Sequence, residues 1–383
     1  MKTSEIRIKR LSTASELTSL RTTWNVLDGG VPFRSFEWLE SWWQSYGVGS
    51  GKELLALAAF DQDGQLVGLA PWYIEPFAFQ RRVIRFLGSG EVCSDYLTIL
   101  CRPGCEEQIT LALADWLCAA PRFSASQRPD WDLLELGGID EDDTAVTRLL
   151  EHLVARGNLV HRRSRSSCWR IRLPAGWEAY LATLSKSHRK QIRRLERNYF
   201  QTNRAQLHVV ETAQELDRGL EVLMTLHQRR RESLGDRGCF SSEQFAVFHR
   251  QAARRLLQSG SLRLVWLTVD GRTVAAEYQV LGEGVVYAYQ SGIEPAALGH
   301  EPGRLITLAT LRRAIAEGRY AFDFLRGDES YKAHWRAQPR RTHDIRVVSL
   351  ARGARLRHNL WLASGNVKSW IKRRLKRSGV LAR

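Results

Sequence analysis

The chain has 383 residues, is 44% hydrophobic and carries a formal net charge of +16. This composition excludes a disordered chain, and the length predicts two domains. The sequence contains no run of about 18 apolar residues, which argues against a membrane-spanning helix. Its first residues are polar and charged, which argues against a signal peptide. We therefore expect a cytoplasmic protein. The six cysteines form no C-x-x-C pair, so we expect reduced thiols and neither a zinc site nor a disulfide framework.

The positive charge is concentrated in two segments. Residues 156–204 hold 13 Lys or Arg against 2 acids, and residues 351–383 hold 10 against none. The rest of the chain is slightly acidic. Two local basic surfaces indicate two anionic partners or one extended partner, and they argue against a general nucleic-acid coat.

The first half of the chain alternates helical and strand-like segments. Ser35 is a suitable N-cap for a helix, and Asp63-Gly64 joins two apolar runs as a hairpin turn would. The expected elements, in chain order, are a helix at 13–27, a helix from Ser35, the hairpin, strands "RVIRFLG" and "DYLTIL", a helix near 105–119, the strand "WDLLELGG" and a helix near 141–156.

The second half repeats this order. It predicts a helix at "SSEQFAVFHRQAARRLLQ", a hairpin across Asp270-Gly271, a strand "VVYAYQSG", a helix "GRLITLATLRRAIAEG" and a strand "YAFDFL". The two hairpin turns lie 207 residues apart in the numbering. We infer an internal duplication of an α/β unit, with chance matching of the turns as the alternative.

Between the halves, "LSKSHRKQIRRLERNYF" predicts a basic helix. Arg189, Arg193 and Arg197 form one row at four-residue spacing, and Lys186, Lys190 and Arg194 form a second. Like charges at this spacing weaken an isolated helix, so the rows need either solvent or an anion beside them.

The start of the helix at Pro302-Gly303-Arg304 is a candidate anion site. Pro suits the first helical turn, and Gly leaves the backbone amides accessible to a phosphate. Arg304 can add a charge-assisted contact. The alternative is an ordinary helix start with no ligand.

The neighbouring strand "YAFDFL" contains one acid. Alternation places Ala321, Asp323 and Leu325 on one face and the two phenylalanines on the other. A buried carboxylate needs partners, and the local candidates are Arg326, Tyr331 and Lys332. A purely structural role for this Asp is the alternative.

The segments "LSKSHRKQIRRLERN" and "EPGRLITLATLRRAIAEGRYAFDFLRGDESYKAHW" resemble the BioF2-like acetyltransferase family of the GNAT superfamily, which includes CelD-like cellulose-biosynthesis proteins. The resemblance covers roughly residues 185–335. The first half resembles the degenerate partner domain of tandem proteins and of FemAB-type transferases. The matched positions are Pro302, Gly303, Arg304, Leu305, Asp323 to Asp328, Tyr331, Lys332 and Trp335.

The resemblance implies a tandem GNAT fold of two mixed-sheet α/β domains, at 1–160 and 161–350, followed by a basic tail at 351–383. It also implies direct attack of an amine on the thioester of acetyl-CoA or another acyl-CoA, without a metal. The donor is expected at Pro302, Gly303, Arg304 and Leu305. The catalytic groups are expected among Glu277, Tyr289, Asp323 and Tyr331. The acceptor is expected to contact Arg189, Arg193, Arg326, Asp328 and Lys332.

The acceptor implied by the family is a small-molecule amine or amino sugar, in exopolysaccharide or cell-envelope biosynthesis. The superfamily's usual phosphate loop is replaced by "LGHEPGR", so a FemAB-like transferase that uses aminoacyl-tRNA stays open. A non-catalytic scaffold of a membrane polysaccharide-assembly complex is the third hypothesis. The tail at 351–383 predicts amphipathic helices, either at an anionic membrane surface or docked on the body.

Overall fold

The structure is a computed structural model that describes residues 6–77, 81–119, 131–350 and 353–355. The basic tail predicted at 351–383 lies outside the described residues except for 353–355. Within the described part of the chain, no helix is both long and apolar enough to cross a lipid bilayer.

The N-terminal half combines seven strands with five α-helices among the described residues. Its strands are β1 (Arg7–Leu11), β2 (Glu53–Phe60), β3 (Leu66–Phe77), β4 (Arg81–Phe86), β5 (Leu100–Cys101), β6 (Leu133–Asp140) and β7 (Leu159–Arg172). Its helices are α1 (Ala14–Ser19), α2 (Arg21–Leu27), α3 (Phe36–Trp42), α4 (Glu106–Cys118) and α5 (Thr144–Ala155).

The C-terminal half has a similar inventory. Its strands are β8 (Ala205–Val209), β9 (Leu262–Val269), β10 (Arg272–Leu281), β11 (Val285–Ile293), β12 (Ala321–Arg326) and β13 (Gln338–Val348). Its helices are α6 (Trp177–Thr183), α7 (Lys186–Leu195), α8 (Ala213–Glu232), α9 (Glu243–Gln258), α10 (Pro302–Ala316) and α11 (Ser330–His334).

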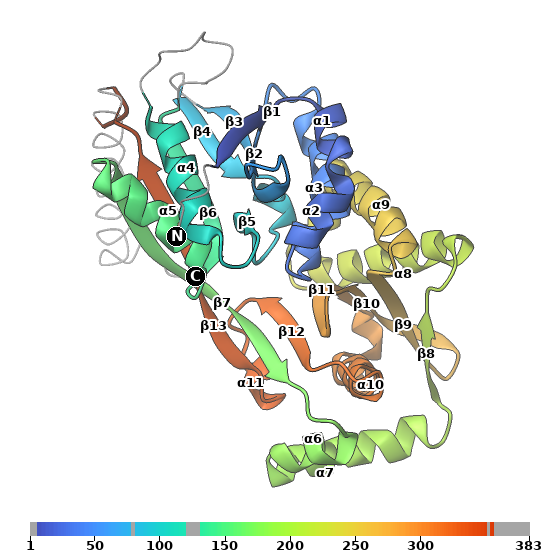
Figure 1. Ribbon diagram of the computed structural model, residues 1–383. Helices are drawn as coiled ribbons and strands as arrows, with labels where there is room; N and C mark the ends of the chain where they lie inside the picture. Colours follow the sequence, from blue (N-terminus) through green and yellow to red (C-terminus); the bar gives the residue numbers. More distant parts are fainter. Residues whose placement is uncertain (1–5, 78–80, 120–130, 351–352, 356–383) are drawn as a thin grey trace, which may run out of the picture.

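One mixed sheet runs through both halves (Figure 1). Its strand order is β1-β2-β3-β4-β6-β13-β7-β12-β11-β10-β9-β8, with β5 added to β3. In each half four strands lead by antiparallel pairing to a parallel pair, β4 with β6 and β11 with β12. The two halves therefore repeat one topology, as the sequence predicts.

The halves exchange their last strands. β7 follows the N-terminal half but pairs with β12, and β13 closes the C-terminal half but pairs with β6. The two exchanged strands also pair with each other along most of their length, and in Figure 1 they run side by side between the halves. The boundary predicted at residue 160 falls inside β7, so the division into 1–160 and 161–350 stays a prediction.

The core forms on both faces of this sheet. Ala321 and Leu325 of β12 belong to the large core shared with the N-terminal half. Phe322 and Phe324 face a second core together with residues of α6, α7 and α10. The predicted alternation along β12 is therefore confirmed.

Some local predictions were wrong. The helix expected at 13–27 is broken at Leu20 into α1 and α2. Of the strand expected at "DYLTIL", only Leu100 is paired, in the two-residue strand β5. The preceding loop takes another course because Cys93 and Tyr96 adopt left-handed backbone conformations, with φ of 53° and 63°.

Candidate active site

A cavity opens where β11 and β12 separate. The two strands pair only where Val285 to Tyr287 meet Ala321 to Asp323, and β12 pairs with β7 on its other side. Beyond this point the gap becomes a cavity of about 750 Å³, bounded by β10, β11, the end of β12, α7, α10 and α11. Such a crevice at the ends of parallel strands is the usual ligand site of α/β sheets.

One wall of this cavity is a strand edge. From Ala288 to Ile293, β11 remains paired with β10 but has no strand partner on its other side among the described residues. The register also shifts there, since Tyr278 pairs with Gln290 and Gln279 with Ala288. Tyr289 is thus the extra residue of a β-bulge, a feature common beside active sites. The edge can take an extended chain that carries amide groups.

Glu277 reaches the cavity from β10. Its carboxyl is buried, and burial raises its pKa to about 7, although Gln279, Thr310 and Arg263 act in the opposite direction. The Thr310 hydroxyl donates to it at 3.4 Å. A carboxyl that titrates near neutral pH is well suited to accept a proton from an amine.

Two tyrosines also belong to the lining of this cavity. The Tyr289 hydroxyl donates to the carbonyl of Val92 in the N-terminal half at 2.6 Å, and burial raises its pKa. Tyr331 of α11 lines the cavity and packs edge-on against Phe324. Its pKa is raised by burial and by nearby carboxylates, Glu277 among them. Both phenols therefore keep their protons at neutral pH.

The start of α10 faces the cavity in part. Gly303 and Arg304 line it, whereas Pro302 and Leu305 are buried in the protein. The amides of Arg304 and Leu305 donate to the carbonyl of Glu301, and proline has no N–H. Within the described part of the chain the Gly303 amide has no acceptor, so one N–H of this turn is available to a ligand.

Glu301 places a negative charge at this helix start. Its carboxylate accepts from Gln191 at 2.8 Å and pairs with Arg194 and Arg304. The two arginines are thereby held at the rim of the cavity, beside the Gly303 amide. An anionic ligand would compete with Glu301 for them.

Asp323 lies outside the lining of this cavity. Its carboxylate accepts from the Tyr96 hydroxyl, from Arg170 and from the amide of Leu325, each at 2.7 Å. The partners expected from the sequence were therefore wrong. Two of the true partners, Tyr96 and Arg170, are distant along the chain. The 87–97 loop and β7 bring them to Asp323.

The charged turn after β12 is held together internally. Lys332 is buried and donates to the carbonyls of Leu325, Arg326 and Gly327, at 3.2, 3.0 and 2.9 Å. Asp328 accepts from Trp169 at 3.0 Å. Lys332 and Arg326 line the cavity, whereas Asp328 does not.

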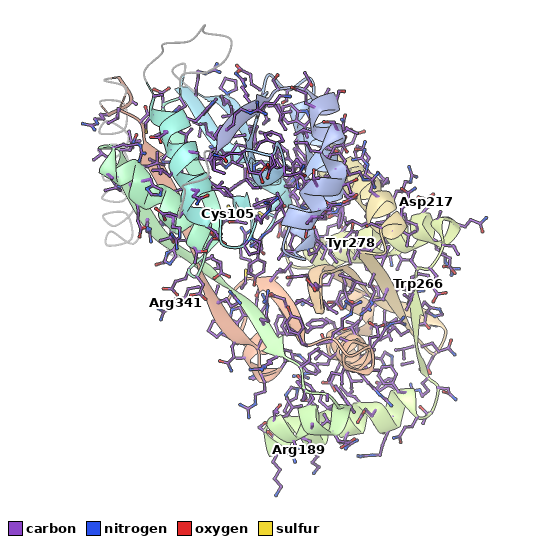
Figure 2. The ribbon with its side chains drawn as sticks, viewed as in Figure 1. Cys105, Arg189, Asp217, Trp266, Tyr278 and Arg341 are labelled. Atoms are coloured by element: carbon purple, nitrogen blue, oxygen red, sulfur yellow. The ribbon has the colours of Figure 1, made fainter. Side chains whose placement is uncertain are left out.

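The basic helix α7 is partly neutralised. Arg189, at the periphery in Figure 2, donates to the carbonyls of Ala182 and Leu184. Arg193 pairs with Glu178 and Glu196. Neither arginine lines the cavity.

Comparison with known proteins identifies the C-terminal half. Residues 186–333 match the family model described as an acetyltransferase (GNAT) domain. This match is confined to the C-terminal half and covers less than half of the chain. The acyltransferase class expected from the sequence is confirmed at this level, while the more specific BioF2-like and CelD-like assignment is not tested by the match. No curated protein sequence matches the chain.

Solved structures extend the likeness to both halves. FemX is similar at a TM-score of 0.59 and 11% identity, over 88% of this chain and 96% of FemX. A conserved protein of unknown function from Bacteroides thetaiotaomicron VPI-5482 gives 0.55 and 12%, over 90% and 100%. The C-terminal domain of a putative lysylphosphatidylglycerol synthetase from Agrobacterium fabrum gives 0.52 and 10%, over 93% and 97%. At these identities the likeness shows the fold alone.

The cavity between β11 and β12, which we call the GNAT cavity, also contains residues that the sequence did not reveal. His188, Gln290, Ser291 and Thr307 line it. His188 lies in the basic helix α7. Its Nδ1 lies 2.9 Å from the carbonyl of His334, and burial lowers its pKa. Polar residues in the strand "VVYAYQSG" were the available signal, because an edge that pairs with no strand tolerates them.

Metal-ligating groups do not gather in this domain. Among the described residues, no group of three or more His, Cys, Asp or Glu side chains is arranged to hold a metal ion. All six cysteines are free thiols.

Proposed function

We propose that this protein is an N-acyltransferase that moves an acyl group from acyl-CoA to an amine. The observation that carries the proposal is the cavity between β11 and β12, which joins a free strand edge, a buried carboxyl and a helix start. The family resemblance adds a BioF2-like or CelD-like enzyme and an amino sugar or similar envelope precursor as the acceptor.

The donor is proposed to lie along the free edge of β11. The pantetheine arm of CoA carries two amides, which suits the backbone from Ala288 to Ile293, where β11 has no second strand partner among the described residues, although the Ser291 carbonyl lies 3.0 Å from His227 Nδ1. The diphosphate is placed at the Gly303 amide and the positive end of α10, with Arg304 and Arg194 beside it. In the complex, these arginines would bind the phosphates in place of the Glu301 carboxylate.

The transfer step needs a base and a proton donor. Glu277 is proposed to take the proton from the acceptor ammonium, so that the neutral amine attacks the thioester carbon. The new C–N bond forms as the C–S bond breaks, and the sulfur leaves as a thiolate that takes a proton from Tyr331. The nitrogen loses its second proton as it becomes an amide, and this proton restores the Tyr331 phenol. Tyr289, whose hydroxyl is bonded to Val92, is proposed to position the bulge.

Calorimetric titration with CoA and assay of free thiol release from acetyl-CoA test the proposal. We expect CoA to bind and thiol release to depend on an added amine. Binding of aminoacyl-tRNA without binding of CoA would instead favour the FemAB-like alternative. The pairing of Arg193 and Arg194 with carboxylates leaves α7 fewer free charges for tRNA. If neither donor binds, the scaffold hypothesis gains.

A further inference from the structure

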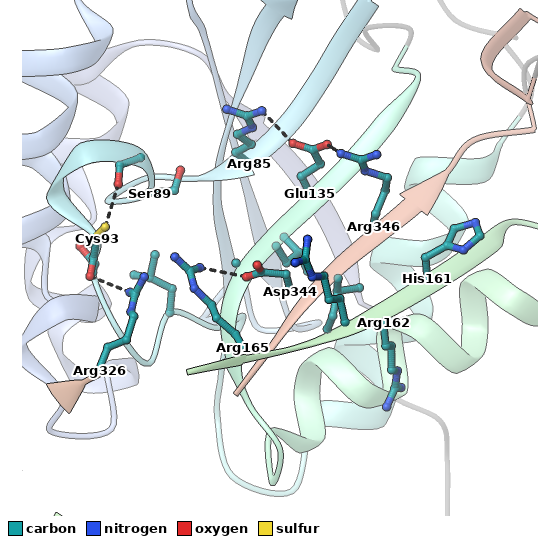
Figure 3. A pocket seen from close by; sticks show the side chains of 17 residues that line it. Arg85, Ser89, Cys93, Glu135, His161, Arg162, Arg165, Arg326, Asp344 and Arg346 are labelled. Carbon is teal, nitrogen blue, oxygen red and sulfur yellow. Dashed lines mark hydrogen bonds and ion pairs between the residues drawn. The ribbon is translucent and has the colours of Figure 1, made fainter. Parts of the chain in front are cut away.

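A second cavity lies in the N-terminal half, where β4 and β6 separate. These strands pair in parallel only at Val83 with Leu133 and at Ile84 with Leu134. Beyond that point a cavity of about 400 Å³ is bounded by the 87–97 loop, β6 and the exchanged strands β7 and β13 (Figure 3). Unlike the GNAT cavity, it extends over β13 and β7, and its lining includes no residue of α4, the helix that connects β4 to β6.

This cavity is rich in arginine. Its lining contains six arginines and two carboxylates, which are Arg85, Arg162, Arg163, Arg165, Arg326, Arg346, Glu135 and Asp344. Some of these charges are paired across the strands. Glu135 bridges Arg85 at 2.7 Å and Arg346 at 2.6 Å, and Asp344 bonds Arg165 at 2.9 Å. Figure 3 shows Arg85, Glu135 and Arg346 in one row.

Two arginines of β7 remain without a counter-charge. The side chains of Arg162 and Arg163 form no ion pair or hydrogen bond with any residue that the structure describes. Alternation places Arg163 on the same face of β7 as Arg165. Its cross-strand neighbour is Asp344, but that carboxylate already bonds Arg165. Arg162, the next residue along the strand, points to the opposite face, so Arg163 is the uncompensated guanidinium on the arginine-bearing face, and it favours an oxyanion there.

The two cavities meet at one residue. Arg326 lines both. Its guanidinium is fixed by Asp95, with Nε at 2.9 Å from the carboxylate, and by the carbonyl of Cys93 at 2.9 Å. The two cavities are therefore adjacent at Arg326.

We propose that the arginine-rich cavity binds an anionic group of the acceptor, a phosphate or a carboxylate, while the acceptor amine enters the GNAT cavity. This inference rests on the proposed function and adds the substrate class: an amine that carries an oxyanion. Arg163 is the principal contact, and Arg326 supports it. The group that binds here is not itself transferred.

Cys93 provides a local test that does not depend on catalysis. Its thiol is exposed and lines the cavity, so its alkylation, located by peptide mass spectrometry, reports whether the cavity is occupied. At constant ionic strength, inorganic pyrophosphate or citrate should slow alkylation about fivefold or more. Arg163→Glu should abolish this protection. Arg172→Glu, on the same strand but outside the lining, should retain it. An unchanged rate with both anions, or equal protection in Arg163→Glu, overturns the proposal.

Acceptor kinetics test the link to the transfer reaction. Phosphoethanolamine or β-alanine should have a KM at least about tenfold below that of ethanolamine. Arg163→Gln should remove this preference without changing the KM for acetyl-CoA, whereas Arg172→Gln should keep it. Equal use of the neutral amine by the unmodified protein contradicts the proposal. If no amine is acylated, the proposed function fails, and the Cys93 measurement still decides whether the cavity binds oxyanions.

Discussion

The two halves of the molecule each contain a cavity beside a parallel strand pair, and the two cavities differ in their chemistry. In the C-terminal half, the helix between the separating strands begins with Gly303 and Arg304 at the cavity. In the N-terminal half, the equivalent helix α4 has Glu106 and Glu107 in its first turn, and neither lines the arginine-rich cavity. A helix start with two acids repels phosphate. The positive charge there comes from the strands instead.

The buried carboxyl shows the same divergence. The hairpin turns at Asp63 and Asp270 are 207 residues apart in the numbering, and this offset places Ala70 of β3 at the position of Glu277. Ala70 is fully buried and apolar. The cavity of the C-terminal half thus contains the proposed base and donor seat, whereas the arginine-rich cavity contains neither. Duplicated units of one fold can in this way divide donor and acceptor recognition.

The largest effect is expected at Glu277. Glu277→Gln removes the proposed base and should lower kcat about 10³-fold, within the range for general bases. The KM for acetyl-CoA should change little. In the unmodified enzyme kcat should rise with pH through about 7. If this variant had normal activity, the buried carboxyl of Glu277 would not be a catalytic difference between the two halves.

Stability provides the control for this variant. Burial raises the pKa of Glu277 from 4.5 to about 7, so the unfolded chain loses this proton first and the folded protein loses stability between these pH values. The variant avoids that loss. At pH 8 its free energy of unfolding should exceed that of the unmodified protein by up to about 3 kcal/mol. Denaturant unfolding at pH 5 and pH 8 measures the difference.

Asp323 tests whether charge near the crevices supports the fold. Asp323→Asn leaves the buried Arg170 contact without its counter-charge and should destabilise the protein by about 3 kcal/mol. The KM for acetyl-CoA should stay within about twofold, since the side chain lies outside the GNAT cavity. A fall in kcat without any loss of stability would instead support the catalytic role predicted from the sequence.

Gly303 tests the donor seat. A Cβ at this position would lie 3.1 Å from Cδ1 of Ile293, and a branched side chain would cover the free amide. Gly303→Val should weaken CoA binding about thirtyfold, as overpacking costs of this size suggest. Gly299→Val is the matched control, because a Cβ there meets nothing within 4 Å. Unchanged CoA affinity in Gly303→Val would argue against the seat.

The smallest effect is expected at Glu301. Its carboxylate shares Arg194 and Arg304 with the proposed diphosphate. Glu301→Gln removes the competing charge and should tighten CoA binding about fivefold, as expected for a partly exposed ion pair. Weaker binding in calorimetry would mean that Glu301 serves mainly to position the arginines.

Local signals in the sequence predicted the repeated elements and the crevice in the C-terminal half. Hairpin turns, caps and alternation depend on neighbouring residues, so the α10 start and both faces of β12 could be predicted. The exchanged strands were not predicted. In "LVHRRSRSSCWRIR" the regular alternation is hidden by arginines that are compensated only by residues far along the chain, such as Asp344 and Asp323.

The candidate site shows the same limit. Glu277 was one of four candidates, and the sequence could not rank them because its raised pKa follows from burial by non-local packing. Lys332 was expected to contact substrate because it is charged and follows the strand. The structure shows its ammonium directed at three backbone carbonyls, a geometry that no spacing rule reveals.

Hydrogen exchange with and without CoA tests the central claim most directly. If CoA lies along the free edge between β11 and β12, the amides from Ala288 to Ile293 and that of Gly303 should exchange more slowly when it is bound. Those of residues 83–94, beside the arginine-rich cavity, should keep their rates. Protection confined to the N-terminal crevice, or none at either crevice at saturating CoA, would contradict the assignment of the donor to the C-terminal half.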